Sequence, residues 1–125
     1  MATEVNEAGY QDLRDYVMDN WSYIEFRDDM GEVVQVDNKD RLLIGTDLNF
    51  AWTTANTDQE LKVEGTIAGS NVLNGAEVTI AESALYKVDT AGDELHSDTD
   101  TAFVFGDNDD ELQVTHSIEL PQLTQ

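Results

Sequence analysis

The chain has 125 residues, enough for one domain with its own core, and no cysteine, which excludes disulfides and thiolate metal sites. Its 27 acidic residues stand against six Lys and Arg, for a formal net charge of −21, which disfavours nucleic acids and anionic membranes as partners. With no apolar run of membrane-spanning length and no signal-peptide pattern, we expect a soluble protein made in the cytoplasm.

Residues 6–20 have the apolar period of an α-helix, with Asn6 as its cap and Glu7 at its positive end. Apolar side chains recur there at three- or four-residue steps and predict one buried stripe. The predicted stripe consists of Tyr10, Leu13, Val17 and Trp21.

After Trp21 the pattern changes to the alternation of β-strands. Short strands are expected in the segments SYIEFR, VVQV, RLLI, LNFAW, ELKVEGTIAG, EVTI, ALYKVD, TAFVFG and LQVTHSIEL. In LNFAW the residues Leu48, Phe50 and Trp52 should point inward. Gly65 occupies an inward position of its strand, which indicates a bulge or a close neighbour.

The last predicted strand alternates over 112–120 and ends at Pro121, because proline cannot donate a hydrogen bond to a sheet. Many short strands separated by turns predict a mainly β fold, an antiparallel β-sandwich (jelly-roll-like) with one N-terminal α-helix. We divide the chain into a helical segment at 1–21, a β-sandwich domain at 22–120 and a polar tail at 121–125.

The acidic segment GDNDDEL raises the question of a calcium site. An EF-hand loop would use Asp107, Asp109 and Glu111 as ligands. It also needs glycine at the sixth position and a carboxylate at the twelfth, where this chain has Leu112 and Ile118. We therefore expect the tip of a β-hairpin, and keep a structural cation at the surface as the alternative.

A second candidate metal site lies in HSDTDT, where His96, Asp98 and Asp100 would point the same way along a strand. A solvated edge or turn is the simpler interpretation. His116 falls on the apolar face of the last strand and is expected in the core with a hydrogen-bond partner.

Most aromatic residues occupy inward positions and should pack in the core, whereas Tyr23 and Tyr86 are the best candidates for exposure. The sequence contains no nucleophile elbow and no glycine-rich phosphate loop. We therefore predict no catalytic residues, no cofactor and no enzymatic activity.

Three explanations of the acidity remain open. A halophilic protein carries such a surface because molar salt shortens the Debye length to about 3 Å and screens the self-repulsion. The scarcity of lysine and the excess of Asp over Glu favour this explanation. Binding of divalent ions, and mimicry of DNA or binding of a basic partner, are the alternatives.

The order of motifs resembles that of small β-sandwich structural proteins of tailed viruses, often labelled tail-fibre proteins. The matching segments are NEAGYQDLRDYV, YIEF, AESALYKVDTAGDEL, TAFVFG and ELQVTHSIEL. Residues 28–52 depart from that pattern, and no receptor-binding residue can be transferred. Together with the composition, the resemblance implies a virus of a halophilic archaeon.

These observations predict a non-enzymatic structural protein on the exterior of the virion, assembled in the host cytoplasm. It would belong to the tail, baseplate or fibre, or serve as capsid decoration or turret, and would act through protein–protein contacts and host attachment. Expected partners are other virion proteins, further copies of the chain and a host surface receptor. A carbohydrate- or calcium-binding module of a halophile is the alternative.

Overall fold

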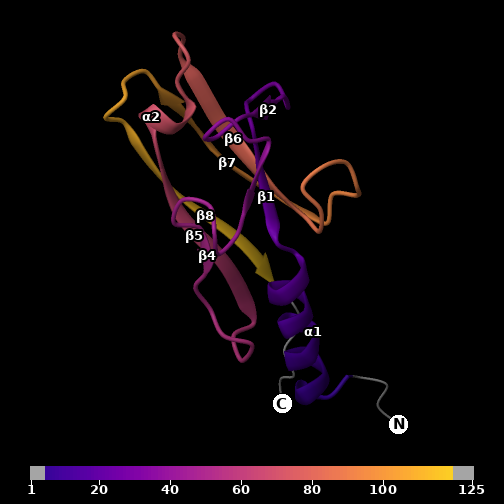
Figure 1. The fold of residues 1–125 in the computed structure, drawn as a ribbon. Helices are drawn as coiled ribbons and strands as arrows, with labels where there is room; N and C mark the ends of the chain where they lie inside the picture. Colours follow the sequence, from indigo (N-terminus) through magenta and orange to yellow (C-terminus); the bar gives the residue numbers. More distant parts are fainter. Residues whose placement is uncertain (1–4, 120–125) are drawn as a thin grey trace.

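The computed structural model describes residues 5–119, apart from the side chains of residues 100 and 101. Two antiparallel sheets pack around one core, and helix α1 (Glu7–Asn20) projects beyond them at one end (Figure 1). The strands are β1 (Tyr23–Arg27), β2 (Val33–Val34), β3 (Arg41–Leu43), β4 (Ala51–Trp52), β5 (Glu60–Ala68), β6 (Val78–Tyr86), β7 (His96–Phe105) and β8 (Glu111–Glu119), with a short helix α2 (Gly69–Val72) between β5 and β6. The predicted β-sandwich with an N-terminal helix is confirmed.

The first sheet has the order β2-β1-β6-β7, with β3 paired to the other half of the β1 edge. The second sheet has the order β4-β5-β8, and β5 pairs with β8 along nine residues. Strands β7 and β8 are consecutive, yet β7 pairs with β6 and β8 with β5. The turn at 106–110 therefore carries the chain from one sheet to the other, and the predicted hairpin tip is wrong in that respect.

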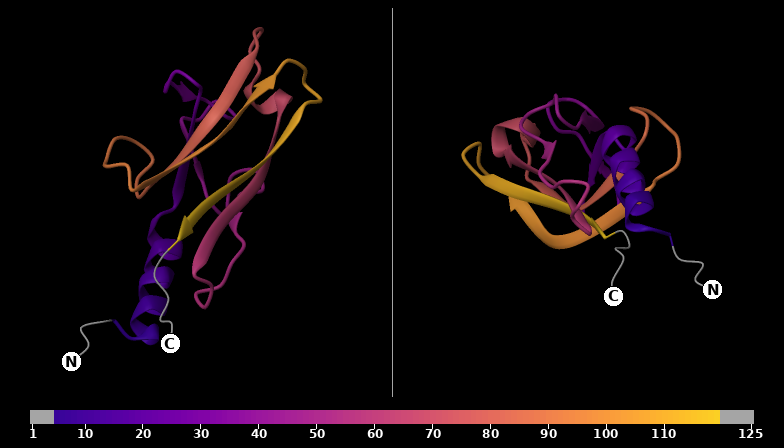
Figure 2. Two further views of the ribbon diagram at one scale, coloured as in Figure 1. Left: turned by 180° about the vertical axis from the view of Figure 1, so that it is seen from behind. Right: turned by 90° about the horizontal axis from the view of Figure 1, so that it is seen from below.

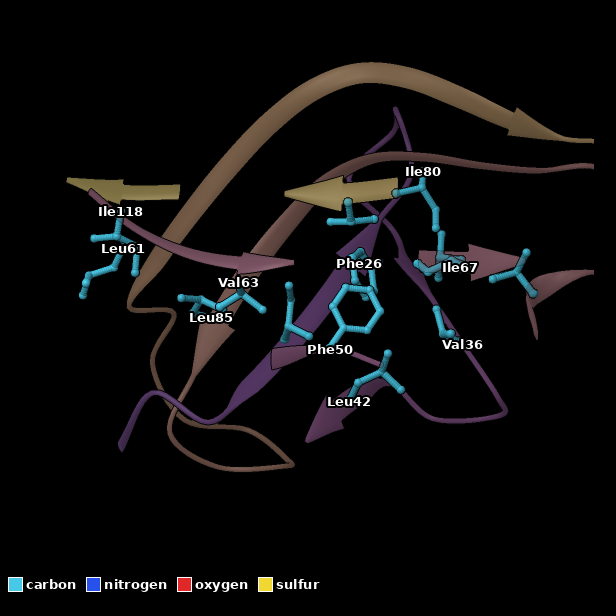
Figure 3. Packing of buried hydrophobic residues seen from close by; sticks show 14 of the residues in the cluster. Phe26, Val36, Leu42, Phe50, Leu61, Val63, Ile67, Ile80, Leu85 and Ile118 are labelled. Atoms are coloured by element: carbon cyan, nitrogen blue, oxygen red, sulfur yellow. The ribbon is translucent and has the colours of Figure 1, made fainter. Parts of the chain in front are cut away.

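The core lies between the sheets and contains the inward residues of both (Figure 3). Leu61, Val63 and Ile67 of β5 are fully buried, as the alternation predicted. The Phe50 ring covers Gly65, where an added Cβ atom would lie 2.6 Å from ring carbons. The predicted close neighbour of Gly65 is thus Phe50.

Two predicted inward positions are wrong. Leu48 has a positive φ of 50° and is 37% exposed, because the chain turns there before the short β4. On α1, Leu13 is 50% exposed, whereas Arg14 is fully buried beside Val17. The Arg14 side chain reaches the Glu7 carboxylate at 2.9 Å and the Asn56 carbonyl oxygen at 2.7 Å, and these contacts turn the helix away from the predicted stripe.

Helix α1 begins after Asn6 as predicted, although the Asn6 backbone carbonyl, rather than its side chain, accepts the first hydrogen bonds. Within the described part of the chain, neither helix has the length and apolar character required to span a bilayer.

Candidate functional site

The predicted acidic segment is a turn held together by its own carboxylates. Asp110 Oδ2 accepts hydrogen bonds from the N–H groups of Gly106 and Asp107, both at 2.9 Å. Asp107 Oδ1 accepts one from the Asp109 N–H at 3.0 Å. Glu111 is exposed at the start of β8. The carboxylates of this segment therefore serve the backbone of the turn, as is typical of Asp in turns.

The second predicted group lies on β7. Asp98 Oδ2 accepts a hydrogen bond from the Ser117 N–H at 3.1 Å, which caps a donor on the free edge of β8. The side chain of Asp100 is outside the described residues. Among the side chains that the structure describes, no three His, Asp or Glu residues are grouped so as to hold a metal ion. Among the described side chains, the predicted metal candidates thus form no such group.

The structure instead brings both histidines of the chain together. His116 Nδ1 hydrogen-bonds with Ser83 Oγ at 2.7 Å, and His116 Nε2 with His96 Nδ1 at 2.9 Å. Ser83 belongs to β6, His96 to β7 and His116 to β8, so this Ser83–His116–His96 chain of hydrogen bonds joins the two sheets. The prediction that His116 is a core residue with a hydrogen-bond partner is confirmed.

Burial controls the protonation of His116. The residue is fully buried, and the pKa of its imidazole is lowered from 6.5 to about 4. The loss of solvation is the largest cause, the neighbouring His96 acts in the same direction, and Asp98 acts in the opposite direction. His116 is therefore neutral at pH 7, with one ring nitrogen donating and the other accepting.

A cleft of about 320 Å³ adjoins this chain of hydrogen bonds. Its walls are formed by residues 80–83 of β6, residues 112–115 of β8 and Phe26. Ser83 lines the cleft but is only 2% exposed, so its hydroxyl offers little surface to a substrate. The arrangement is best suited to holding the sheets in register through buried, mutually satisfied polar groups.

A cluster of charges covers the outer face of the first sheet. Glu25, only 5% exposed, accepts hydrogen bonds from Arg27 Nε at 3.0 Å and from Arg41 Nε at 3.1 Å. Arg27 also pairs with Glu82 at 3.2 Å and with Glu94 at 2.6 Å. Burial acts to lower the pKa of Arg27, but the hydrogen bonds to Glu94, Glu25 and Glu82 outweigh it and raise that pKa.

These arginines fasten the 87–95 loop over the first sheet. Arg41 Nη1 donates to the carbonyl oxygens of Val88 and Ala91 at 2.8 and 2.7 Å. Its guanidinium also stacks 3.5 Å from the centre of the Tyr86 ring. Tyr86 is consequently buried, and its predicted exposure is wrong, whereas Tyr23 is half-buried.

Every cationic side chain of the protein has an acceptor or a ring within the same chain. Arg14, Arg27, Lys39, Arg41 and Lys62 form ion pairs with carboxylates. Lys87 Nζ donates to the Tyr16 hydroxyl at 2.6 Å. Most carboxylates of the described residues lie outside these ion pairs, and carboxylates dominate the exposed loops.

Comparisons of the chain with protein-family models, with curated proteins and with solved structures found no match.

Proposed function

We propose that the chain is a non-enzymatic structural protein on the exterior of a tailed-virus particle from a high-salt environment, where it acts through contacts with other virion proteins. The observation that carries this proposal is the separation of charge. The few cations fix the protein's own loops and strands, while the carboxylates face solvent. The tailed-virus setting comes from the sequence resemblance described above.

A rigid two-sheet body suits such a role. Its core extends through both sheets, and the Ser83–His116–His96 chain and the arginine cluster add polar contacts at the inner and outer faces of the first sheet. A scaffold of this kind presents fixed surfaces to its neighbours, and repeated copies can add many modest contacts. Attachment to a host receptor would be a second role of the same exterior position.

The high-salt part of the proposal is tested by unfolding the protein in urea at potassium chloride concentrations from molar to millimolar. The Debye length grows from about 3 Å at 1 M salt to about 30 Å at 0.01 M. We expect the free energy of unfolding to fall as salt is removed, because the unpaired carboxylates then repel one another.

The matched control neutralises three exposed carboxylates through Asp12→Asn, Asp19→Asn and Asp93→Asn. Because repulsion is the proposed cause, this variant should lose less stability than the wild type when salt is removed. An identical loss in both proteins would contradict the electrostatic explanation.

The virion part is tested by immunogold electron microscopy with antibodies against the chain, on particles released by cells that carry its gene. Labelling at fixed positions of the particle is the expected result. A protein found only in the cell fraction would exclude the virion role. If the purified protein were then stabilised against heat by calcium or by a glycan, the binding-module alternative would replace it.

A further inference from the structure

The outer face of the second sheet differs in composition from the rest of the surface. The central outward positions of its three strands carry small or uncharged polar side chains, together with one lysine and one glutamate, whereas three further glutamates occupy outward positions at the ends of β5 and β8. We call this surface the neutral face, and it consists of Ala51, Thr53, Lys62, Glu64, Thr66, Gln113, Thr115 and Ser117. Its formal charge is zero in a chain whose net charge is −21.

The outer faces of the two sheets differ in what covers them. The 87–95 loop lies on the side of the first sheet that faces away from the second sheet (Figures 1 and 2). The arginine cluster fastens this loop over the outer face of the first sheet. Two contacts reach the neutral face from β7 and from the turn before β4, and both are made to backbone N–H groups: Asp98 accepts from Ser117 at 3.1 Å and Asn49 accepts from Thr66 at 2.6 Å. Thr115 Oγ1 donates to Glu64 Oε2 at 3.4 Å, and Lys62 Nζ lies 3.4 Å from Glu60 Oε1. The described part of the chain therefore leaves this face open.

Depletion of charge marks the centre of protein–protein interfaces. The exposed loops and helix α1 carry many carboxylates, and a second copy would meet them with carboxylates of its own. At the centre of the neutral face two copies can approach with one lysine and one glutamate from each. Acidic residues return at its ends, where Glu60, Glu111 and Glu119 occupy the rim.

The two charges on the neutral face are complementary to themselves. Lys62 and Glu64 are two residues apart on β5 and point to the same side. A two-fold axis that lies in the plane of the contact, parallel to the sheet and perpendicular to β5 at the level between these two residues, would set each Lys62 opposite the Glu64 of the second copy. Such an isologous contact forms two identical ion pairs at once.

We propose that the neutral face is the interface between two copies of this chain, packed face to face about a two-fold axis between Lys62 and Glu64. This inference rests on the proposed role as an assembly protein and names the surface through which copies meet. The neutral face spans residues 51–53, 62–66 and 113–117, which at about 3.3 Å per residue and about 4.8 Å between strands give a contact of roughly 200 Å² per copy, small for a stable dimer. The dimer is therefore weak in solution, and repetition in an assembly strengthens it.

The test is sedimentation equilibrium of the whole chain in molar potassium chloride at protein concentrations up to about 1 mM, which detects free energies of association near −4 kcal/mol. The wild type should show a reversible monomer–dimer equilibrium. Lys62→Glu should raise the dissociation constant about tenfold, because two attractive pairs become repulsive. Near-ultraviolet circular dichroism of each variant confirms that it is folded.

Three further variants separate pairing from net charge. Glu64→Lys makes the protein less negative but should also weaken the dimer about tenfold, because Lys62 then faces a lysine. The double exchange of Lys62→Glu with Glu64→Lys should restore wild-type association. Lys39→Glu, which changes the net charge as Lys62→Glu does but lies on the connection before β3, should leave the dissociation constant within about twofold.

A wild type that stays monomeric throughout this concentration range would overturn the inference, as would a dimer that all four variants leave unchanged. Failure of the double exchange to restore association would overturn the Lys62–Glu64 pairing. The virion role is judged separately by immunogold labelling, so a labelled particle built from a monomeric protein would refute only this interface.

Discussion

His116 gives a measurable link between burial and stability. Its imidazole has a pKa of about 4 in the folded protein, against about 6.5 in an unfolded chain. Between these two pKa values the unfolded chain binds a proton that the folded chain does not bind, so the free energy of unfolding must fall as the pH drops. The loss amounts to about 2 kcal/mol between pH 7.5 and pH 5, approaches about 3 kcal/mol near pH 4 and is constant below that.

The assay is urea unfolding from pH 7.5 to pH 5 in molar potassium chloride, followed by tryptophan fluorescence. Ordinary carboxylates stay mostly ionised in this range, so their titration contributes little. The comparison protein carries His116→Phe together with Ser83→Ala, which removes both ends of the 2.7 Å hydrogen bond and leaves no unsatisfied hydroxyl in the core. Its stability should change with pH by about 2 kcal/mol less than that of the wild type.

Equal pH dependence in the two proteins would refute the reasoning. A second measurement is independent of stability, because the chain contains only His96 and His116 and their ring resonances can be separated by nuclear magnetic resonance. The ring of His116 should keep its neutral chemical shift down to about pH 5. A midpoint near 6.5 for His116 would show that burial does not control its protonation.

Two other substitutions probe close packing and buried charge. Gly65→Ala should destabilise the protein by about 1–3 kcal/mol in urea unfolding, because its Cβ would lie 2.6 Å from the Phe50 ring, whereas Gly106→Ala, whose nearest atom is 3.8 Å away, should be nearly neutral. Glu25→Gln should cost about 3 kcal/mol, since it leaves two arginines beside an uncharged partner, while Glu60→Gln at an exposed pair should cost less than about 1 kcal/mol. Equal effects within either pair would contradict the structural assignment.

The strand pattern could be predicted because it depends on local alternation alone. In β8 the inward positions Val114, His116 and Ile118 are all buried. Successive side chains of a strand point to opposite faces, so a half-buried strand must show its period in the sequence. The same argument placed Gly65 on the inner side, although only the fold reveals that Phe50 covers it.

Contacts between distant segments could not be predicted in this way. Arg14 is buried because it donates to the Asn56 carbonyl oxygen, 42 residues further along the chain. The apolar period of the sequence instead predicts Leu13 as the buried residue. Tyr86 was assigned to the surface because nothing in the pattern shows that the following loop folds back over it. The meeting of His96 with His116 also depends on which sheet each strand joins, and a turn between two strands does not determine that.

The distribution of the six cations explains how so acidic a chain keeps an ordered interior. Its three arginines are buried or nearly so, at 0%, 15% and 9% side-chain exposure for Arg14, Arg27 and Arg41. Each uses the several donors of one guanidinium to satisfy two or more acceptors at once, which a lysine cannot do in a fixed plane.

The lysines lie at the surface, where Lys39 and Lys62 are 52% and 40% exposed and each pairs with one nearby carboxylate. Because the arginines bind the protein's own carboxylates and loops, the attraction available to a neighbouring molecule comes from lysines, and Lys62 is the lysine on the neutral face, where Glu64 is the one acidic residue at the centre. The arginines thus stabilise the outer face of the first sheet, and the outer face of the second sheet is left as the contact surface.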